Sequence, residues 1–221
     1  MLALGACSYG ANIKTPAAPA VTEGQRLPLA MGVYYSPEFL SYIHRQTAGA
    51  GPHSVTFNVG NTSATHFSNV FASYFESAVQ FPERPTPEQP AGGVVAVLIP
   101  QLESLEMTDP ALYGWGGTWN TALVYRFQMV DPTGLPIANW LVRGNGSDGG
   151  VDWWGNAGQN IAGEAYSKAL AAAGRNFVEG FAKEAQVREW MQAQGVQTTL
   201  RSLPWLRPAR ALTEKQPEKP L

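Results

Sequence analysis

The pattern of apolar and polar positions is clearest over Ser54–Phe81, where it predicts a strand followed by a helix. Apolar and polar residues alternate along the first part, as far as Val59, and a period of two is typical of a half-buried strand. After a turn at 60–63, apolar residues recur at steps of three and four as far as Val79, and Pro82 stops the helix. A helix with one apolar stripe must lie on a sheet, which the rest of the chain should supply.

Further stretches have the length and composition of strands. Leu27–Tyr35 places apolar residues on one face, and Val94–Ile99 is a continuous apolar run of the kind found in strands covered on both faces. Trp119–Val130 and Leu135–Arg143 flank Asp131–Gly134, whose residues are typical of a turn. The last two stretches therefore predict a hairpin.

A second long helix is predicted over Asn160–Gln194, where alanine and aromatic residues recur near the helical period and Gly195 follows. Its many alanines would let it approach a sheet closely. The glycine-rich, polar stretch Gly144–Gly158 is interpreted as a mobile loop, and a second loop is predicted at 81–93.

The order of these elements, β-β-α-β-β-β-α, indicates an α+β fold. We expect an antiparallel-rich mixed sheet of about five strands with two long helices packed on one face. A chain of 221 residues with 44% hydrophobic residues can bury one sizeable core, so a single domain is predicted over 27–201. Residues 8–26, rich in alanine and proline, are interpreted as a flexible tether, and the proline-rich segment 202–221 as a disordered tail.

The first residues resemble the end of a bacterial lipoprotein signal peptide. Leu4–Cys7 matches the lipobox residue by residue: a branched apolar residue, two small ones and the cysteine that receives lipid. The basic region and most of the apolar region of such a signal are missing, so 1–7 is interpreted as its remnant. The alternative is an ordinary N-terminus of small residues. Ser8 after the cysteine resembles the pattern sorted to the bacterial outer membrane, with the protein anchored on the periplasmic side.

Composition excludes several classes of protein. The net charge of -2 and the pI near 5.9 leave no basic stripe for nucleic acid. The sequence has no run of eighteen apolar residues, so no spanning helix is predicted. The single cysteine, Cys7, excludes an internal disulfide and a cysteine cluster for zinc.

The sequence offers little for catalysis. Three histidines are present: His44, His53 and His66. None has metal-ligand spacing, and no serine or cysteine is set up as a nucleophile. Asn145, Asp148 and Asp152 carry oxygens that suit weak calcium binding, but their spacing fits no EF-hand, and a solvated loop explains them better. We therefore expect no enzyme, cofactor or resident metal.

Tryptophans supply the candidate contact surface. Trp115, Trp153 and Trp154 lie among glycines in predicted loops, where little scaffold is available to bury their rings. We predict that they bind a partner, whereas Trp119 and Trp140 are predicted to be core residues of strands.

Four features together resemble the lipoprotein domains built on a TolB amino-terminal-like scaffold. The features are Leu4–Cys7, the strand–helix unit through Val79, the hairpin turn with the following Ile137–Trp140, and the alanine-rich helix. The group includes curli-secretion lipoproteins, penicillin-binding-protein activators and auxiliary lipoproteins of envelope ABC transporters. The resemblance implies a non-catalytic role in periplasmic assembly or transport, and Cys7 is the one functional residue that it matches.

These observations favour a lipid-anchored, periplasm-facing component of an envelope complex that acts by binding. Its expected partners are the membrane, other envelope proteins and, as a further candidate, a second copy of the chain. The alternative is a periplasmic binding or carrier domain for a small or lipidic ligand, which would need a hydrophobic cavity between sheet and helices.

Overall fold

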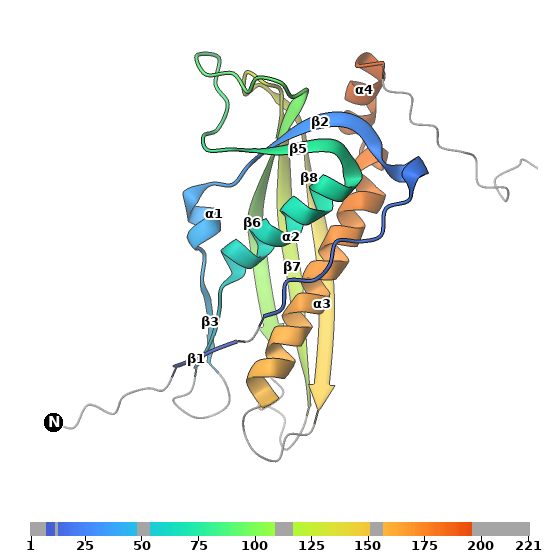
Figure 1. The fold of residues 1–221 in the computed structure, drawn as a ribbon. Helices are drawn as coiled ribbons and strands as arrows, with labels where there is room; N and C mark the ends of the chain where they lie inside the picture. The colour runs from blue at the N-terminus through green and yellow to red at the C-terminus, as the bar shows by residue number, and fades with distance from the viewer. Residues whose placement is uncertain (1–7, 12, 48–53, 109–116, 151–156, 196–221) are drawn as a thin grey trace, which may run out of the picture.

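A computed structural model describes residues 8–11, 13–47, 54–108, 117–150 and 157–195 (Figure 1). A five-stranded sheet carries two helices on one face, the shorter α2 (Val59–Tyr74) and the long α3 (Ala157–Gly180). A small sheet lies beside it. The α+β class and the mixed five-stranded sheet are confirmed.

The strand order of the main sheet is β5-β2-β6-β7-β8. These strands are β2 (Leu27–Tyr34), β5 (Phe75–Phe81), β6 (Ala96–Thr108), β7 (Gly117–Val130) and β8 (Pro136–Gly150). β2 runs parallel to both β5 and β6, whereas β6, β7 and β8 are antiparallel neighbours. The prediction of an antiparallel-rich sheet is therefore wrong in detail, because the crossover through α2 returns the chain parallel to β2.

The predicted hairpin is confirmed, and its second strand is longer than expected. Asp131 Oδ1 accepts hydrogen bonds from the backbone N–H of Thr133 (2.8 Å) and of Leu135 (2.9 Å), which closes the turn. β8 then continues through 144–150, so the loop that the glycine-rich sequence predicts there is instead a strand. Glycine is used there for close approach: a Cβ at Gly144 or Gly146 would collide with carbonyl oxygens of α3.

The first predicted helix ends earlier than its periodicity indicated. α2 stops at Tyr74, and the next residues form β5, which pairs with β2 along its length. Val79, expected on the buried stripe, is 50% exposed. Pairing with the edge of β2 therefore prevails over the helical spacing. The strand predicted before this helix is β4 (Ser54–Phe57), and it belongs to the small sheet.

The second predicted helix is interrupted. α3 ends at Gly180, a 3-10 turn covers Phe181–Lys183, and α4 (Ala185–Ala193) follows. Glu184 between them has an extended backbone, which separates the two helices. The expected pair of long helices is thus one long helix, a shorter one and two small ones, of which α1 (Pro37–Ser41) precedes the small sheet.

The segment expected to be a tether makes defined contacts. β1 (Ser8–Gly10) pairs in parallel with β4, and β3 (His44–Thr47) completes the small sheet. The segment that leads from β1 to β2 runs along α2 and α3 (Figure 1). Ser167 Oγ donates to the carbonyl of Lys14 (2.8 Å), and His66 Nδ1 lies 3.1 Å from the carbonyl of Pro16. Polar groups on the helices therefore hold a segment whose composition alone indicated flexibility.

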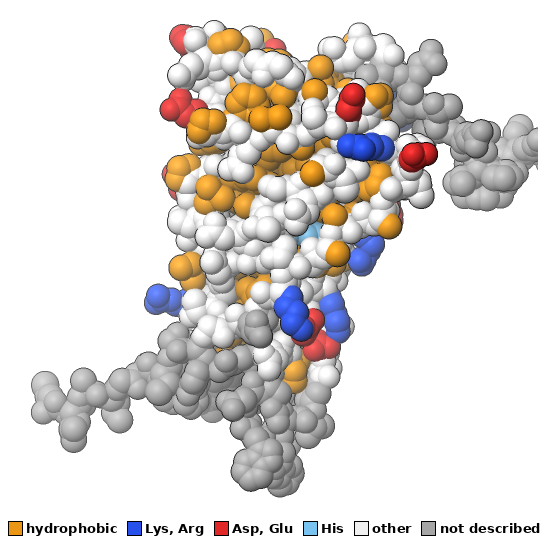
Figure 2. Space-filling model, in the orientation of Figure 1, with side chains coloured by type: hydrophobic (Ala, Val, Ile, Leu, Met, Phe, Trp, Pro, Cys, Tyr) orange, Lys and Arg blue, Asp and Glu red, His pale blue; other side chains and the backbone are white. Residues whose placement is uncertain are grey.

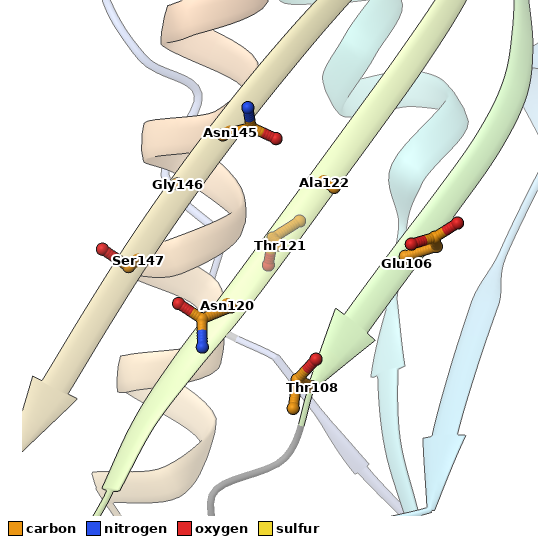
Figure 3. A pocket seen from close by; sticks show the side chains of 8 residues that line it. All are labelled: Glu106, Thr108, Asn120, Thr121, Ala122, Asn145, Gly146 and Ser147. Atoms are coloured by element: carbon orange, nitrogen blue, oxygen red, sulfur yellow. The ribbon is translucent and has the colours of Figure 1, made fainter.

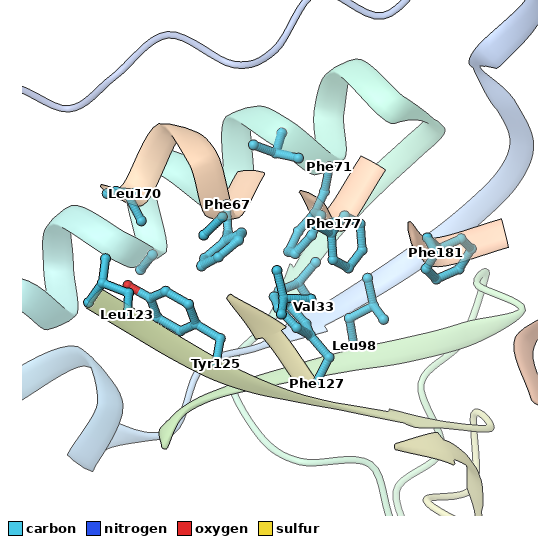
Figure 4. Packing of buried hydrophobic residues seen from close by; sticks show 14 of the residues in the cluster. Val33, Phe67, Phe71, Leu98, Leu123, Tyr125, Phe127, Leu170, Phe177 and Phe181 are labelled. Carbon is cyan, nitrogen blue, oxygen red and sulfur yellow. The ribbon is translucent and has the colours of Figure 1, made fainter. Parts of the chain in front are cut away.

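Aromatic rings fill the layer between the sheet and the helices (Figure 4). Phe67 and Phe71 of α2, Phe177 of α3 and Phe127 of β7 are fully buried. Ring centroids of Phe127 and Phe177 lie 4.8 Å apart, and Phe67 meets Tyr125 edge to face at 4.9 Å. These rings occupy the space in which a ligand of a carrier domain would have to lie.

Candidate functional site

The residues chosen from sequence as sites lie outside the described part of the chain: Cys7, Trp115, Trp153 and Trp154. The elements next to them are described. Ser8, directly after Cys7, pairs with Ser54 in the small sheet. The strand ends that flank 109–116 and 151–156 lie at one end of the sheet, since Gly117 pairs with Gly150 and Thr108 with Asn120. Both tryptophan-bearing segments therefore leave the sheet from the same end.

Trp119 and Trp140 are described, and both are core residues as predicted. Trp119 is 3% exposed and Trp140 is 7% exposed. The ring of Trp140 stacks on Phe127 of the neighbouring strand at 5.7 Å. Tryptophans in strands thus stabilise the core.

The weak calcium site considered from sequence finds no support in the described residues. The carboxylate of Asp148 lies 2.6 Å from Lys168 Nζ, and Asn145 lies on the exposed face of β8. Asp152 is outside the described residues. A lysine already neutralises the carboxylate that calcium would need.

One hollow of about 380 Å³ lies on the face of the sheet, over the ends of β6, β7 and β8 (Figure 3). Polar side chains from all three strands line it: Glu106, Thr108, Asn120, Thr121, Asn145 and Ser147. The alternation of each strand puts most of these groups on the face away from the helices. The hollow is shallow and polar, so it suits hydrogen bonding to a partner better than enclosure of an apolar ligand.

A second hollow, of about 500 Å³, separates β6 from α1. We call it the β6 groove. One wall is the strand from Gln101 to Leu105, and the other is formed by α1 and the start of α2 with Phe39, Tyr42 and Val59. Apolar groups therefore line the far wall, and a strand edge forms the near one.

Local sequence explains why this groove is open. β2 pairs with β6 only at Met31–Val33. Ser36 then caps α1 by accepting from the Phe39 N–H (3.2 Å), and Pro37 begins the helix. This turn carries the chain away from the sheet. β6 nevertheless continues to Thr108, and over this stretch β7 is its one paired neighbour among the described residues.

The β6 groove is acidic. Glu38 has its pKa lowered by its own backbone N–H and by the Ser36 hydroxyl, against a small opposing effect of burial. Glu103 has its pKa lowered mainly by hydrogen bonds from Arg126, at 2.8 and 3.0 Å. No lysine, arginine or histidine lies among the described residues that line the groove. Both carboxylates are therefore charged at neutral pH.

A buried hydroxyl cluster lies behind the groove. Ser63 Oγ is 2.7 Å from the Tyr125 hydroxyl and 3.0 Å from that of Tyr166. Burial raises the pKa of Tyr166 to about 12 and that of Tyr125 well above its ordinary value. Neither hydroxyl therefore ionises at neutral pH. The hydrogen bonds of Ser63 join α2 to β7 and α3.

His66 is fully buried between α2, α3 and the N-terminal segment. Burial lowers its pKa, while the carbonyl groups of Pro16 and Leu170 act in the opposite direction. Within the described residues, no three metal-ligating side chains gather at one place. Its role is to hold the segment that leads from β1 to β2.

Sequence reasoning missed both hollows. The polar hollow had a detectable signal, because glycine and apolar residues alternate with Asn139, Arg143, Asn145 and Ser147 along β8. The β6 groove had no such signal in the sequence, because it depends on how many residues of β2 pair with β6.

The described helices include none that is long and apolar enough to cross a membrane. No model of a known protein family matches the chain, and a search of curated proteins finds no match.

Several solved structures resemble this fold. A protein of Xanthomonas campestris assigned to the DUF330 family model has a TM-score of 0.51 at 10% identity, over 85% of this chain and 99% of its own. A hypothetical protein of Chlamydia trachomatis has a TM-score of 0.41 at 14% identity, over 69% and 94%. A minor lipoprotein of Acinetobacter baumannii has a TM-score of 0.39 at 9% identity, over 72% and 93%. The likeness to the Xanthomonas protein shows a shared fold and extends no further.

Proposed function

We propose that this chain is a lipid-anchored, periplasm-facing binding component of a bacterial envelope complex at the outer membrane. The observation that carries the proposal is the position of Cys7. It ends the lipobox-like Leu4–Cys7, and the next residue, Ser8, already pairs with Ser54 in the small sheet. A lipid on Cys7 would therefore hold the domain directly against the membrane surface.

The surface of the domain supports a binding role. The polar hollow and the β6 groove both open on the outside of the domain, and the interior between sheet and helices is filled by aromatic rings. The carrier alternative would need a cavity in this layer, which the buried rings of the described residues fill. The proposal includes the resemblance to TolB amino-terminal-like lipoprotein domains. It also includes self-association of the chain as one mode of assembly.

Metabolic labelling with a fatty acid tests the anchor. The full chain is expressed in a bacterium behind a complete lipoprotein signal, as wild type, Cys7→Ser and the matched control Ser8→Ala. We expect label and membrane association in wild type and Ser8→Ala, and neither in Cys7→Ser, because the thiol is the acceptor of the lipid. Equal labelling of Cys7→Ser and wild type would overturn the proposal.

A further inference from the structure

We propose that the free edge of β6 binds an extended, basic segment of a partner protein as an added strand. This edge is the backbone from Pro100 to Thr108 on the side away from β7. The inference rests on the proposed binding function but not on the lipid anchor. It names the place of contact and the chemistry of the partner.

The first observation is that this edge has no partner among the described residues. β2 leaves β6 after the pair Val33–Leu98, and beyond that point β7 is the one strand that pairs with β6 among the described residues. Unpaired N–H and C=O groups in a row are a template for another strand. Nine residues from Pro100 to Thr108 give room for a strand of ordinary length, about five or six residues.

The second observation is the space beside the edge. An added strand needs room for its backbone and for the side chains on its inner face. The β6 groove supplies about 500 Å³ there, with Phe39 and Val59 on its far wall. Leu102 and Leu105 on β6 are half-buried and pack against the core, so apolar side chains of the added strand would extend an existing apolar surface.

The third observation is charge. Three exposed carboxylates lie in or beside the groove: Glu38, Glu103 and Glu106. Of these three, Glu103 forms an ion pair with Arg126. A segment that alternates apolar residues with lysine or arginine matches this arrangement, because successive side chains of a strand point to opposite faces.

A second copy of the chain fits this edge poorly. Two β6 edges paired about a two-fold axis would bring Glu103 and Glu106 of one copy close to the same residues of the other. Like charges directly opposite each other destabilise a strand pair. The glutamates therefore oppose self-pairing of this edge and leave it open to a basic strand.

The test uses the full chain and a fluorescent peptide of alternating valine and lysine, about eight residues long. Its control is the same peptide N-methylated at alternate residues, which keeps every side chain but cannot donate backbone hydrogen bonds along one edge. We expect the first peptide to bind at least about tenfold more tightly in fluorescence anisotropy. Binding should also slow amide hydrogen exchange at 101–108.

Equal binding of the two peptides, or no binding up to about 1 mM, would overturn the proposal. Slow exchange of all amides over 101–108 in the free protein would also overturn it, because the edge would then be covered by the chain itself.

A matched pair of variants locates the site. Glu38→Gln should weaken binding of the valine–lysine peptide about threefold or more, whereas Glu88→Gln, an exposed glutamate in the 81–93 loop, should leave it unchanged. Equal effects of both variants would reduce the binding to general charge attraction and contradict the site. Cys7→Ser should bind the peptide like wild type, so failure of the anchor and failure of the β6 edge are separate results.

Discussion

Two long strands of the same sheet, β8 and β6, expose an edge in different ways. Side chains from the helices hydrogen-bond to backbone groups at the edge of β8. Gln186 accepts from the Asn139 N–H (3.2 Å), and Asn176 donates to the Arg143 carbonyl (2.8 Å). Lys168 Nζ donates to the Ser147 carbonyl at 3.1 Å. The edge of β6 from Pro100 to Thr108 has no such cover among the described residues.

The difference arises from neighbours and not from the strands themselves. α3 lies close to β8 because glycine at 144 and 146 leaves room for its backbone. Its polar side chains then reach the strand edge and satisfy alternate backbone groups. β6 loses its neighbour where Pro37 begins α1. A protein can thus block one edge against aggregation and keep another for recognition.

The largest expected effect comes from separating α3 from β8. In Gly144→Ala the new Cβ would meet the Ala169 carbonyl and Ala173, which are backbone and core atoms with little freedom to move. We expect a loss of about 2 kcal/mol or more in the free energy of unfolding, measured by urea denaturation.

Gly24→Ala is the control for this change, since nothing lies within 4 Å of its Cβ position. Its effect should stay below about 0.5 kcal/mol. Similar midpoints for Gly144→Ala and Gly24→Ala would show that the close approach of α3 does not determine the cover of β8.

An intermediate effect is expected from pH. His66 contacts Gly174 of α3, and burial lowers its pKa in the folded protein. The unfolded chain therefore binds this proton at higher pH than the folded chain does. Stability contributed by neutral His66 is present above the unfolded pKa of about 6.5 and is lost as pH falls below it, by at most about 1.4 kcal/mol per pH unit.

The measurement is the free energy of unfolding of wild type and His66→Gln between pH 7 and pH 5. We expect the wild type to lose stability more steeply, together with faster amide exchange along β8. Parallel curves for the two proteins would show that protonation of His66 does not loosen α3.

The smallest expected effect concerns a single edge contact. Asn176→Ala removes the side chain that donates to the Arg143 carbonyl, and Arg175→Ala is the exposed neighbour for comparison. The first change should cost about 0.5–1 kcal/mol and leave β8 more open to pairing, detected as self-association by sedimentation. The idea that side chains cover this edge fails if the two variants behave alike.

Local patterns predicted most of the strands. Leu27–Tyr35, Val94–Ile99 and the hairpin about Asp131–Gly134 were found because side-chain alternation and turn chemistry are properties of neighbouring residues. The same reasoning failed at 75–79 and at 144–150, where pairing with β2 and packing against α3 decided the structure. Each failure involves partners far away in the sequence.

The candidate site was less predictable than the fold. Cys7, Trp115, Trp153 and Trp154 were selected by motif and composition, and they stay predictions because they lie outside the described residues. Sequence analysis does not predict the β6 groove. Whether a strand has a free edge depends on which strand pairs with it, and the local sequence pattern does not specify that pairing.

The sequence by itself determined the α+β class, the hairpin, the buried tryptophans and the lipobox-like start, since each depends on residues close together in the chain. The tertiary structure alone decided the parallel pairing of β2, the ordering of 13–26 along the helices and the contrast between the covered β8 edge and the open β6 edge. These features come from long-range pairing and packing, in which the free energy of an element depends on a partner that its own residues do not specify.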